Sequence, residues 1–313
     1  MPKPTPEYFR RLAELVAIDD AGARPTRPVL EAFSGAEMAA IPVGTAEDLE
    51  TAVARARTAQ EGWAQQTPQQ RAAVLNRFSD LVYRNAAELM DIAQAETGKA
   101  RIYAQEEVMD VALTARHYAT TGPKTLAERR VKGMLPGATS VRVRYQPKGV
   151  VGVISPWNYP LTLAVSDAVA ALIAGNGVVI KPDSQTPYCA LAVADLLYQA
   201  GLPRELFAVV PGPGSVVGQA IVATTDYVMF TGSSATGASL AEQAGRRLIG
   251  FSAELGGKNP MIVTADADID KAVEGAARAC YSNSGQLCIS IERLYVDKQV
   301  ADEFTTKFAA FVS

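Results

Sequence analysis

The chain has few residues of the kinds that support metal or disulfide chemistry. Its 313 residues include three cysteines and one histidine, His117. A small, odd number of cysteines does not suggest a disulfide framework. Zinc sites and serine–histidine mechanisms usually need more than a single imidazole. We therefore expect a reducing, cytoplasmic setting, no metal site, and a packing or surface role for His117.

Strong net charge and long apolar runs are also missing. The formal net charge is -3, and this near balance argues against a nucleic-acid surface. No uncharged apolar run reaches the about 18 residues of a membrane span, and no secretory leader is expected at the start. The composition, 48% hydrophobic and 20% charged, is that of a globular protein long enough for two or more domains.

The first third of the sequence has the periodicity of helices. Thr45 followed by Asp48, and Thr67 followed by Gln70, are helix-start patterns, because each pair can satisfy free backbone N–H groups. They predict helices over residues 46–63 and from residue 68, and a third helix is expected over about 100–120. The alternation over 141–145 predicts a strand of a hairpin. Its exposed edge needs a cover, either another subunit or a loop.

From residue 150 onward, short apolar runs alternate with helical stretches. Strands are expected at 150–154, 178–181, 207–210, 227–230 and 248–254, with helices at 161–174, 187–200, 216–223 and 235–244. This order predicts a doubly wound parallel sheet covered on both faces, with ligands beyond the carboxyl ends of its strands. A further α/β unit begins after residue 257, with strands at 261–263 and 293–296, a helix at 269–282, and a helix still running at 313.

Three residues can together carry covalent chemistry on a carbonyl group. Cys288, in the run SGQLC, offers a thiol nucleophile, and Glu254, in ELGGKNP, offers a carboxylate that can activate water. Asn158, in SPWNYP, offers an uncharged N–H donor for an alkoxide. Two of the three also have a simpler structural interpretation: Cys288 as a buried apolar residue and Asn158 as a helix cap. A cysteine hydrolase is a weak alternative, because it would need a base near the thiol and the chain has a single histidine.

Candidate cofactor residues follow the predicted strands. Lys181 can donate to ribose hydroxyls, and Ser184 leaves room for a 2′-phosphate that a carboxylate would repel. Gly232 and Ser233 start a helix whose N–H groups can face a diphosphate. The glycine-rich stretch that includes Gly214 has one residue too many for the standard dinucleotide fingerprint, and it fits a turn and helix start equally well.

Together, these segments resemble the aldehyde dehydrogenase superfamily over essentially the whole chain. The matching stretches are PWNYP, KP at 181–182, FTGS at 230–233, ELGGK and GQLC. The resemblance implies that Cys288 is the nucleophile and Glu254 the general base, with Asn158 and the Cys288 N–H holding the oxyanion. It places the cofactor at Trp157, Lys181, Ser184, Gly214, Gly232, Ser233 and Leu255. An aldehyde would then become a carboxylic acid through a thiohemiacetal and a thioester on Cys288.

The resemblance also implies a division of the chain. A dinucleotide-binding domain would comprise residues 1–128 and 148–256, an oligomerisation hairpin 129–147, and an incomplete catalytic domain 257–313. Family members are longer, so we expect a C-terminally truncated sequence whose full-length parent forms a homodimer or homotetramer. A non-catalytic remnant that binds nucleotide or pairs with full-length subunits is the alternative function.

Within the superfamily, the sequence is most similar to bacterial, actinobacterial-type NADP-dependent succinate-semialdehyde dehydrogenases. Ser184 stands where NAD-preferring relatives often carry glutamate, which favours NADP, with NAD as the alternative cofactor. Many enzymes for this substrate carry an arginine on the helix after the Asn158 loop, whereas residues 161–174 contain no basic residue. The carboxylate anchor would then be elsewhere, with Arg293 as one candidate, or the substrate would be another small or medium-chain aldehyde.

Overall fold

The computed structural model describes residues 4–135 and 137–313. The contacts among these residues divide them into two compact units: the first ends at Ala253, and the second comprises Glu254–Ser313. Residues 1–3 and Pro136, which the predicted domain and hairpin include, lie outside the described residues. The functions assigned to the domains from the sequence stay predictions.

A five-stranded sheet forms the centre of the first unit, in the order β7-β6-β5-β8-β9. Strands β5 (Val150–Ile154), β6 (Gly177–Lys181), β7 (Phe207–Val209) and β8 (Tyr227–Thr231) pair in parallel, and β9 (Gly250–Glu254) follows β8. All residues of β5, β6 and β7 are buried. Strands covered on both faces are continuously apolar, which is why these runs stood out in the sequence.

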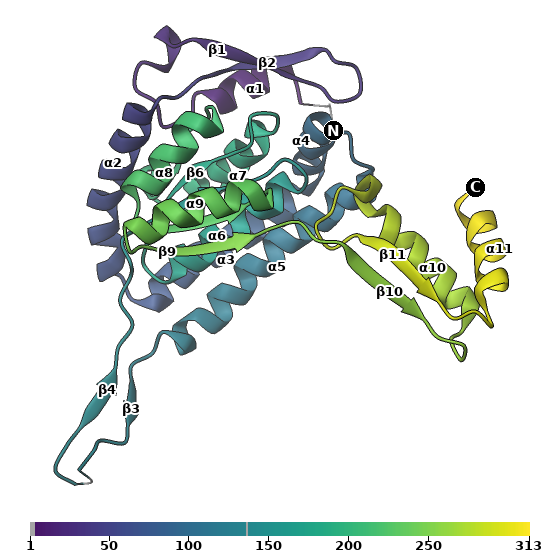
Figure 1. Ribbon diagram of the computed structural model, residues 1–313. Helices are drawn as coiled ribbons and strands as arrows, with labels where there is room; N and C mark the ends of the chain where they lie inside the picture. Colours follow the sequence, from purple (N-terminus) through teal and green to yellow (C-terminus); the bar gives the residue numbers. More distant parts are fainter. Residues whose placement is uncertain (1–3, 136) are drawn as a thin grey trace. The chain divides into compact units, whose positions relative to one another are not determined.

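Helices cover both faces of this sheet, and Figure 1 shows the arrangement. Helices α6 (Pro160–Ile173) and α7 (Pro187–Gln199) pack together and against β5, β6 and β7. Helix α2 (Ala46–Gln65) packs on these strands beside α8 (Gln219–Thr224), and α9 (Ser234–Arg246) contacts α8 and β8. Because the chain turns from one side of β5 to the other after β7, the two helix sets lie on opposite faces. The predicted α/β fold with a parallel sheet is confirmed.

An outer layer of helices packs against α6 and α7. It consists of α3 (Pro68–Arg84), α4 (Ala86–Thr97) and α5 (Arg101–Thr125), while α1 (Pro6–Ala13) contacts α7. Both predicted helix starts are capping boxes: the Thr45 side chain accepts from the Asp48 N–H, and the Thr67 side chain from the Gln70 N–H.

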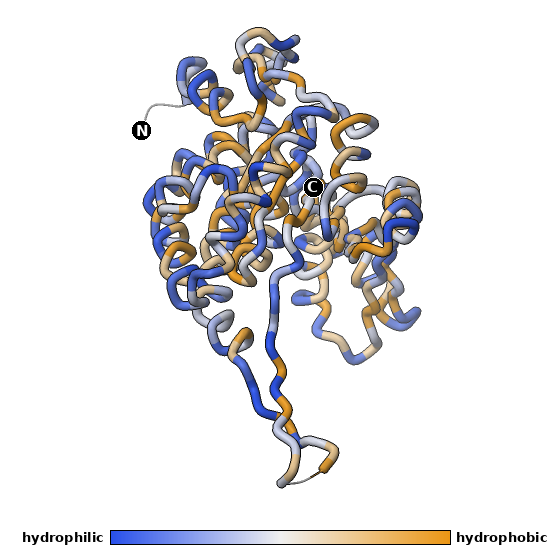
Figure 2. Tube along the Cα trace, turned by 90° about the vertical axis from the view of Figure 1, so that its left-hand side faces the viewer, coloured by the Kyte–Doolittle hydropathy of each residue, from blue (hydrophilic) through white to orange (hydrophobic). Residues whose placement is uncertain are grey.

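Two antiparallel hairpins also belong to the first unit. Strands β1 (Thr26–Leu30) and β2 (Glu37–Pro42), which the sequence did not reveal, form one of them. Strands β3 (Arg129–Val131) and β4 (Val141–Val143) form the other. The β3–β4 hairpin extends away from the rest of this unit, and β4 alternates hydrophobic and hydrophilic residues as expected (Figure 2).

The second unit is a small α/β arrangement. Strands β10 (Asn259–Val263) and β11 (Ile291–Val296) pair in parallel and carry helices α10 (Ile269–Tyr281) and α11 (Ala301–Val312). Its core is a cluster of buried apolar side chains: Val263, Ile269, Val273, Ala276 and Phe304. In the part of the chain that the structure describes, no helix combines the length and apolar character needed to span a membrane.

Candidate active site

The loop that carries Asn158 joins β5 to α6. Ser155 is buried and its N–H donates to the Lys181 carbonyl at 3.2 Å, which ties the start of the loop to β6. Helix α6 starts with Pro160 at its first position, and its N-cap residue, Tyr159, makes no side-chain capping bond. The Asn158 side-chain oxygen instead accepts from the Tyr159 N–H at 3.1 Å. Asn158 is therefore not the cap of α6, and its amide group lies on the loop after the strand.

Two buried charged residues from outside the loop contact it. Lys99 Nζ donates to the Asn158 carbonyl oxygen at 2.8 Å and forms an ion pair with Glu107. Glu107 Oε2 accepts from the backbone N–H groups of Leu161, at 2.9 Å, and Thr162, at 3.2 Å. Burial raises the pKa of the Glu107 carboxyl, although Lys99 and the two N–H groups oppose this shift. Sequence reasoning missed this pair; the missing cap of α6 was the one signal that could have indicated it.

A second buried carboxylate supports the loop after β6 in a similar way. Helix α7 makes no capping bond from its N-cap residue, Thr186. Glu96, at the end of α4, accepts from the Tyr188 N–H at 2.7 Å and the Cys189 N–H at 2.8 Å. Burial raises the pKa of Glu96 to about 8. The starts of α6 and α7, each following a predicted functional loop, are thus both capped by carboxylates from elsewhere in the sequence.

The predicted ribose-binding residues lie at the end of β6. Lys181 is buried and its Nζ donates to the Pro182 carbonyl at 2.6 Å. Burial lowers the pKa of Lys181; Asp183 opposes this effect and Arg27 adds to it. Ser184 lines a cavity of about 100 Å³ together with Arg27 of β1. Arg27 is a further cationic residue in the Ser184 cavity, and sequence reasoning did not select it because the β1–β2 hairpin was not expected.

A larger cavity, of about 510 Å³, lies where the strand order reverses. Ile154 at the end of β5, Gly214 after β7, and Phe230 at the end of β8 line it, with residues from the first turns of α9. A side chain built at Gly214 would meet no other atom within 4 Å, so it would project into open space at the cavity. In open α/β sheets, this switch point is where dinucleotides bind. The cavity therefore lies where this kind of fold offers a nucleotide site, and its occupancy by a cofactor stays a prediction.

The two remaining predicted phosphate-side residues have local structural roles. Ser233 is the N-cap of α9, where its Oγ accepts from the Thr236 N–H at 3.2 Å and donates to Thr236 Oγ1 at 2.9 Å. A side chain at Gly232 would come within 2.6 Å of the Phe230 ring. Trp157 is 40% exposed on the Asn158 loop. Their contacts with a cofactor stay predictions.

In the second unit, the segments that carry Glu254 and Cys288 are joined directly. The Asn259 side-chain amide donates to the carbonyls of Cys288, at 2.7 Å, and Ser290, at 3.0 Å. Lys258 forms an ion pair with Glu292, and Arg293 donates to the Lys258 carbonyl at 2.8 Å. Asn259 and Lys258 follow Glu254 in the same run, so the segment that begins at the candidate base is bonded to the loop of the candidate nucleophile. Arg293, a candidate substrate anchor from the sequence, makes this backbone bond, and its contact with a substrate stays a prediction.

The Cys288 loop starts with an unusual backbone. Asn283, Ser284 and Gly285 all have positive φ angles, of 50°, 58° and 76°. Residues other than glycine rarely adopt this conformation, and such strain is concentrated at functional sites. At the other end of the loop, the buried Ser290 hydroxyl donates to the Cys280 carbonyl at 3.1 Å. Cys288 itself is exposed, whereas Cys189 is buried and burial raises its thiol pKa well above the ordinary value. Of these two thiols, Cys288 is the one accessible for chemistry.

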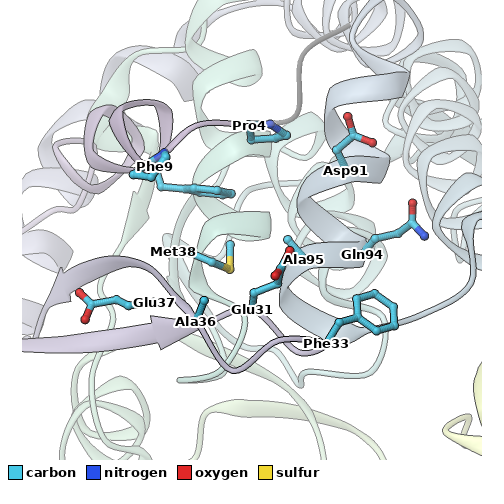
Figure 3. A pocket seen from close by; sticks show the side chains of 11 residues that line it. Pro4, Phe9, Glu31, Phe33, Ala36, Glu37, Met38, Asp91, Gln94 and Ala95 are labelled. Carbon is cyan, nitrogen blue, oxygen red and sulfur yellow. The ribbon is translucent and has the colours of Figure 1, made fainter.

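A separate cavity of about 280 Å³ lies at the N-terminal end of the first unit (Figure 3). Phe9 of α1, Phe33 and Met38 of the β1–β2 hairpin, and acidic side chains including Asp91 of α4 line it. None of the predicted site residues lines this cavity. No group of three or more metal-binding side chains occurs among the residues that the structure describes.

The chain belongs to the aldehyde dehydrogenase family, which it matches over residues 19–313. It is 65% identical over 308 residues to a Mycolicibacterium smegmatis protein named "Putative succinate-semialdehyde dehydrogenase (NADP(+))", covering 98% of this chain and 60% of that protein.

Solved structures agree with this assignment. An aldehyde dehydrogenase from Brucella melitensis biovar abortus 2308 superposes with a TM-score of 0.90 and 32% identity, covering 95% of this chain and 61% of that one. A succinate-semialdehyde dehydrogenase from Burkholderia pseudomallei gives a TM-score of 0.88 and 35% identity, covering 92% and 60%. The chain thus spans about 60% of the length of these relatives.

Proposed function

We propose that this chain carries out, or contributes to, the NADP-dependent oxidation of an aldehyde to a carboxylic acid, with succinate semialdehyde as the first substrate to test. The observation that carries the proposal is the network through Asn259, which joins the exposed Cys288 to the segment that begins at Glu254. A nucleophile and a water-activating carboxylate carried by two linked segments match the needs of a two-step acyl transfer.

Each of the three candidate catalytic residues has its own role in the proposed reaction. The Cys288 thiolate attacks the aldehyde carbon, forming a C–S bond, and the carbonyl electron pair moves to oxygen. The Asn158 amide and the Cys288 N–H would donate to that oxyanion. A bound oxidised nicotinamide would supply the hydride acceptor, so that the substrate would remain on Cys288 as a thioester. Glu254 then takes a proton from water, whose oxygen attacks the thioester carbon and displaces the Cys288 thiolate, releasing the acid.

The cofactor site fits NADP by its charges. Arg27 lines the same cavity as Ser184 and interacts electrostatically with Lys181, and no carboxylate occupies position 184 itself. A 2′-phosphate carries negative charge, which two cations attract and a carboxylate would repel. Replacing Ser184 with glutamate should weaken NADP binding at least tenfold while NAD binding changes by less than threefold. Equilibrium titration of both nucleotides measures this ratio, and an unchanged preference would contradict the assignment.

The substrate proposal follows from the relatives. The Mycolicibacterium smegmatis and Burkholderia pseudomallei proteins both carry succinate-semialdehyde dehydrogenase in their names. At 65% identity, the first of these is similar enough to make the same aldehyde the leading candidate. Other small and medium-chain aldehydes are the matched comparison, because α6 contains no basic residue that could hold a distal carboxylate.

The β3–β4 hairpin is the proposed site of self-association. Its turn exposes Met134 at 93% and Leu135 at 59%, and β4 exposes Val141 at 41%. Its strand edges carry backbone groups that another copy could pair with. Val141→Lys should place a charge on this edge and shift the chain toward the monomer in light scattering, with Ala138→Lys, at an exposed position in the turn, as the control.

The decisive experiment is NADPH formation from succinate semialdehyde and NADP, with a Cys288→Ala variant beside the parent chain. Turnover that disappears in Cys288→Ala supports the proposal. Nucleotide binding without turnover by folded protein would favour the second candidate, a nucleotide-binding polypeptide that pairs with full-length subunits. A panel of aldehydes separates that outcome from an incorrect substrate.

A further inference from the structure

The strongest unexplained feature of the first unit is the ion pair between Lys99 and Glu107. Their side chains are 1% and 0% exposed. Removing two charges from water is costly, and a buried pair can often be replaced by apolar residues of similar volume without loss of stability. Packing alone therefore does not explain why these positions carry charges. An apolar pair could not donate to a carbonyl or accept from backbone N–H groups.

The hydrogen bonds that these two side chains make to backbone groups go to the Asn158 loop and to the first turn of α6. Lys99 Nζ holds the Asn158 carbonyl at 2.8 Å, and it lies 4.2 Å from the centre of the Tyr159 ring. Glu107 holds the N–H groups of Leu161 and Thr162. These contacts lie on both sides of Pro160, which has no N–H of its own to donate. The pair therefore fixes the peptide at Asn158 and the first turn of the helix that follows.

Resting on the proposed function, we propose that Lys99 and Glu107 are positioning residues for aldehyde oxidation, which hold the Asn158 amide where it can donate to the oxyanion. Neither residue needs to contact the substrate. Catalysis depends steeply on such placement, because a displacement of about 1 Å can cost on the order of a hundredfold in rate. Without these bonds, the start of α6 would lose the Glu107 acceptor that caps it.

Glu96 provides a matched control within the same unit. It is a buried carboxylate on the neighbouring helix, and it also caps a helix through two N–H groups. Its bonds go to α7, however, and none goes to the Asn158 loop. Loss of Glu96 disturbs a comparable set of bonds at a different place, so it separates a local positioning effect from a general loss of packing.

The experiment uses the whole chain with three changes: Lys99→Met, the double variant Lys99→Met/Glu107→Leu, and Glu96→Gln. The double variant removes both charges, so it keeps the test valid if an unpaired Glu107 prevents folding. Residue-resolved hydrogen exchange should rise about tenfold or more at Leu161 and Thr162 in the double variant, while Tyr188 and Cys189 change by less than about twofold. Glu96→Gln, which keeps one side-chain oxygen as an acceptor, should raise exchange at Tyr188 and Cys189 and leave Leu161 and Thr162 at parental rates.

Comparing kcat with KM and Kd distinguishes a positioning role of the pair from a purely structural one. For the double variant, kcat should fall about tenfold to a hundredfold, short of the loss of about a hundredfold to a thousandfold expected from removing an oxyanion donor outright. KM for the aldehyde and Kd for NADP should change by less than about threefold. A folded double variant with parental exchange rates or parental kcat would overturn the proposal.

If the parent chain binds NADP but shows no turnover, the proposed function of the isolated chain fails separately. The exchange measurement then decides the positioning role by itself. Unchanged exchange at Leu161 and Thr162 would reject it, and faster exchange confined to that turn would support it.

Discussion

The loops that present Asn158 and Cys288 are held in different ways. In the first unit, buried charges from the α4–α5 connection and from α5 fix the start of α6, and Lys99 reaches the Asn158 carbonyl itself. In the second unit, neutral groups fix the Cys288 loop: the Asn259 amide, the Ser290 hydroxyl and a run of left-handed residues. Bonds to buried charges are strong, and losing one partner leaves the other at a high cost in stability. Neutral hydrogen bonds near the surface are individually weaker, and water can replace a lost partner.

The largest test of this contrast is Lys99→Met in the first unit. It leaves the buried Glu107 carboxylate without its cation, and breaking a buried pair in this way costs about 3–5 kcal/mol in the free energy of unfolding. Urea unfolding of the whole chain measures the change. The double variant Lys99→Met/Glu107→Leu should recover most of the loss. If Lys99→Met were as stable as the parent, the pair would not be acting as a buried ion pair.

A smaller effect is expected from Asn259→Ala in the second unit. The change removes two neutral hydrogen bonds to the carbonyls of Cys288 and Ser290, at a partly exposed position. Each such bond contributes about 1 kcal/mol or less, so the second unit should lose about 1–2 kcal/mol. Hydrogen exchange at residues 286–290 should rise, whereas exchange at Leu161 and Thr162 stays at parental rates. A loss as large as that of Lys99→Met would contradict the proposed difference between the loops.

A further effect concerns pH and the first unit alone. The pKa of Glu96 is raised from an ordinary value of 4.5 to about 8, so between these values the folded chain binds more protons at this position than the unfolded chain does. The free energy of unfolding should therefore fall as the pH rises from 4.5 through 8. Glu96→Gln, which cannot titrate, should flatten this slope. Chemical denaturation at pH 5.5 and pH 8 in both proteins measures it, and parallel slopes would exclude Glu96 as the source.

Local patterns predicted much of the first unit. The capping boxes at Thr45 and Thr67 marked the starts of α2 and α3, because their hydrogen bonds connect residues three apart in sequence. The strands of the central sheet could be predicted because burial on both faces requires uninterrupted apolar runs. Helix α4 was missed because it follows α3 after Asn85, which makes no side-chain cap. Strand β1 was missed because Pro28 lies within it, and proline argues against a strand.

In the candidate site, too, local patterns predicted some residues and missed others. Cys288, Glu254 and Asn158 could be selected because each lies in a short run of distinctive residues. Lys99, Glu107 and Arg27 could not, since their importance comes from partners that are distant in sequence. The Lys99–Asn158 bond spans 59 residues and the Glu107–Leu161 bond spans 54. No periodicity or spacing rule connects residues so far apart, and only the packing of α5 against α6 brings them together.

The buried pair also constrains how this sequence can change through evolution. A substitution that removes the charge at position 99 leaves an unpaired carboxylate at position 107, and the reverse change leaves an unpaired ammonium group. Either single step passes through a destabilised protein, while the apolar pair beyond it can be stable. Positions 99 and 107 should therefore covary among homologues, with lineages keeping both charges or losing both, and with mixed pairs rare.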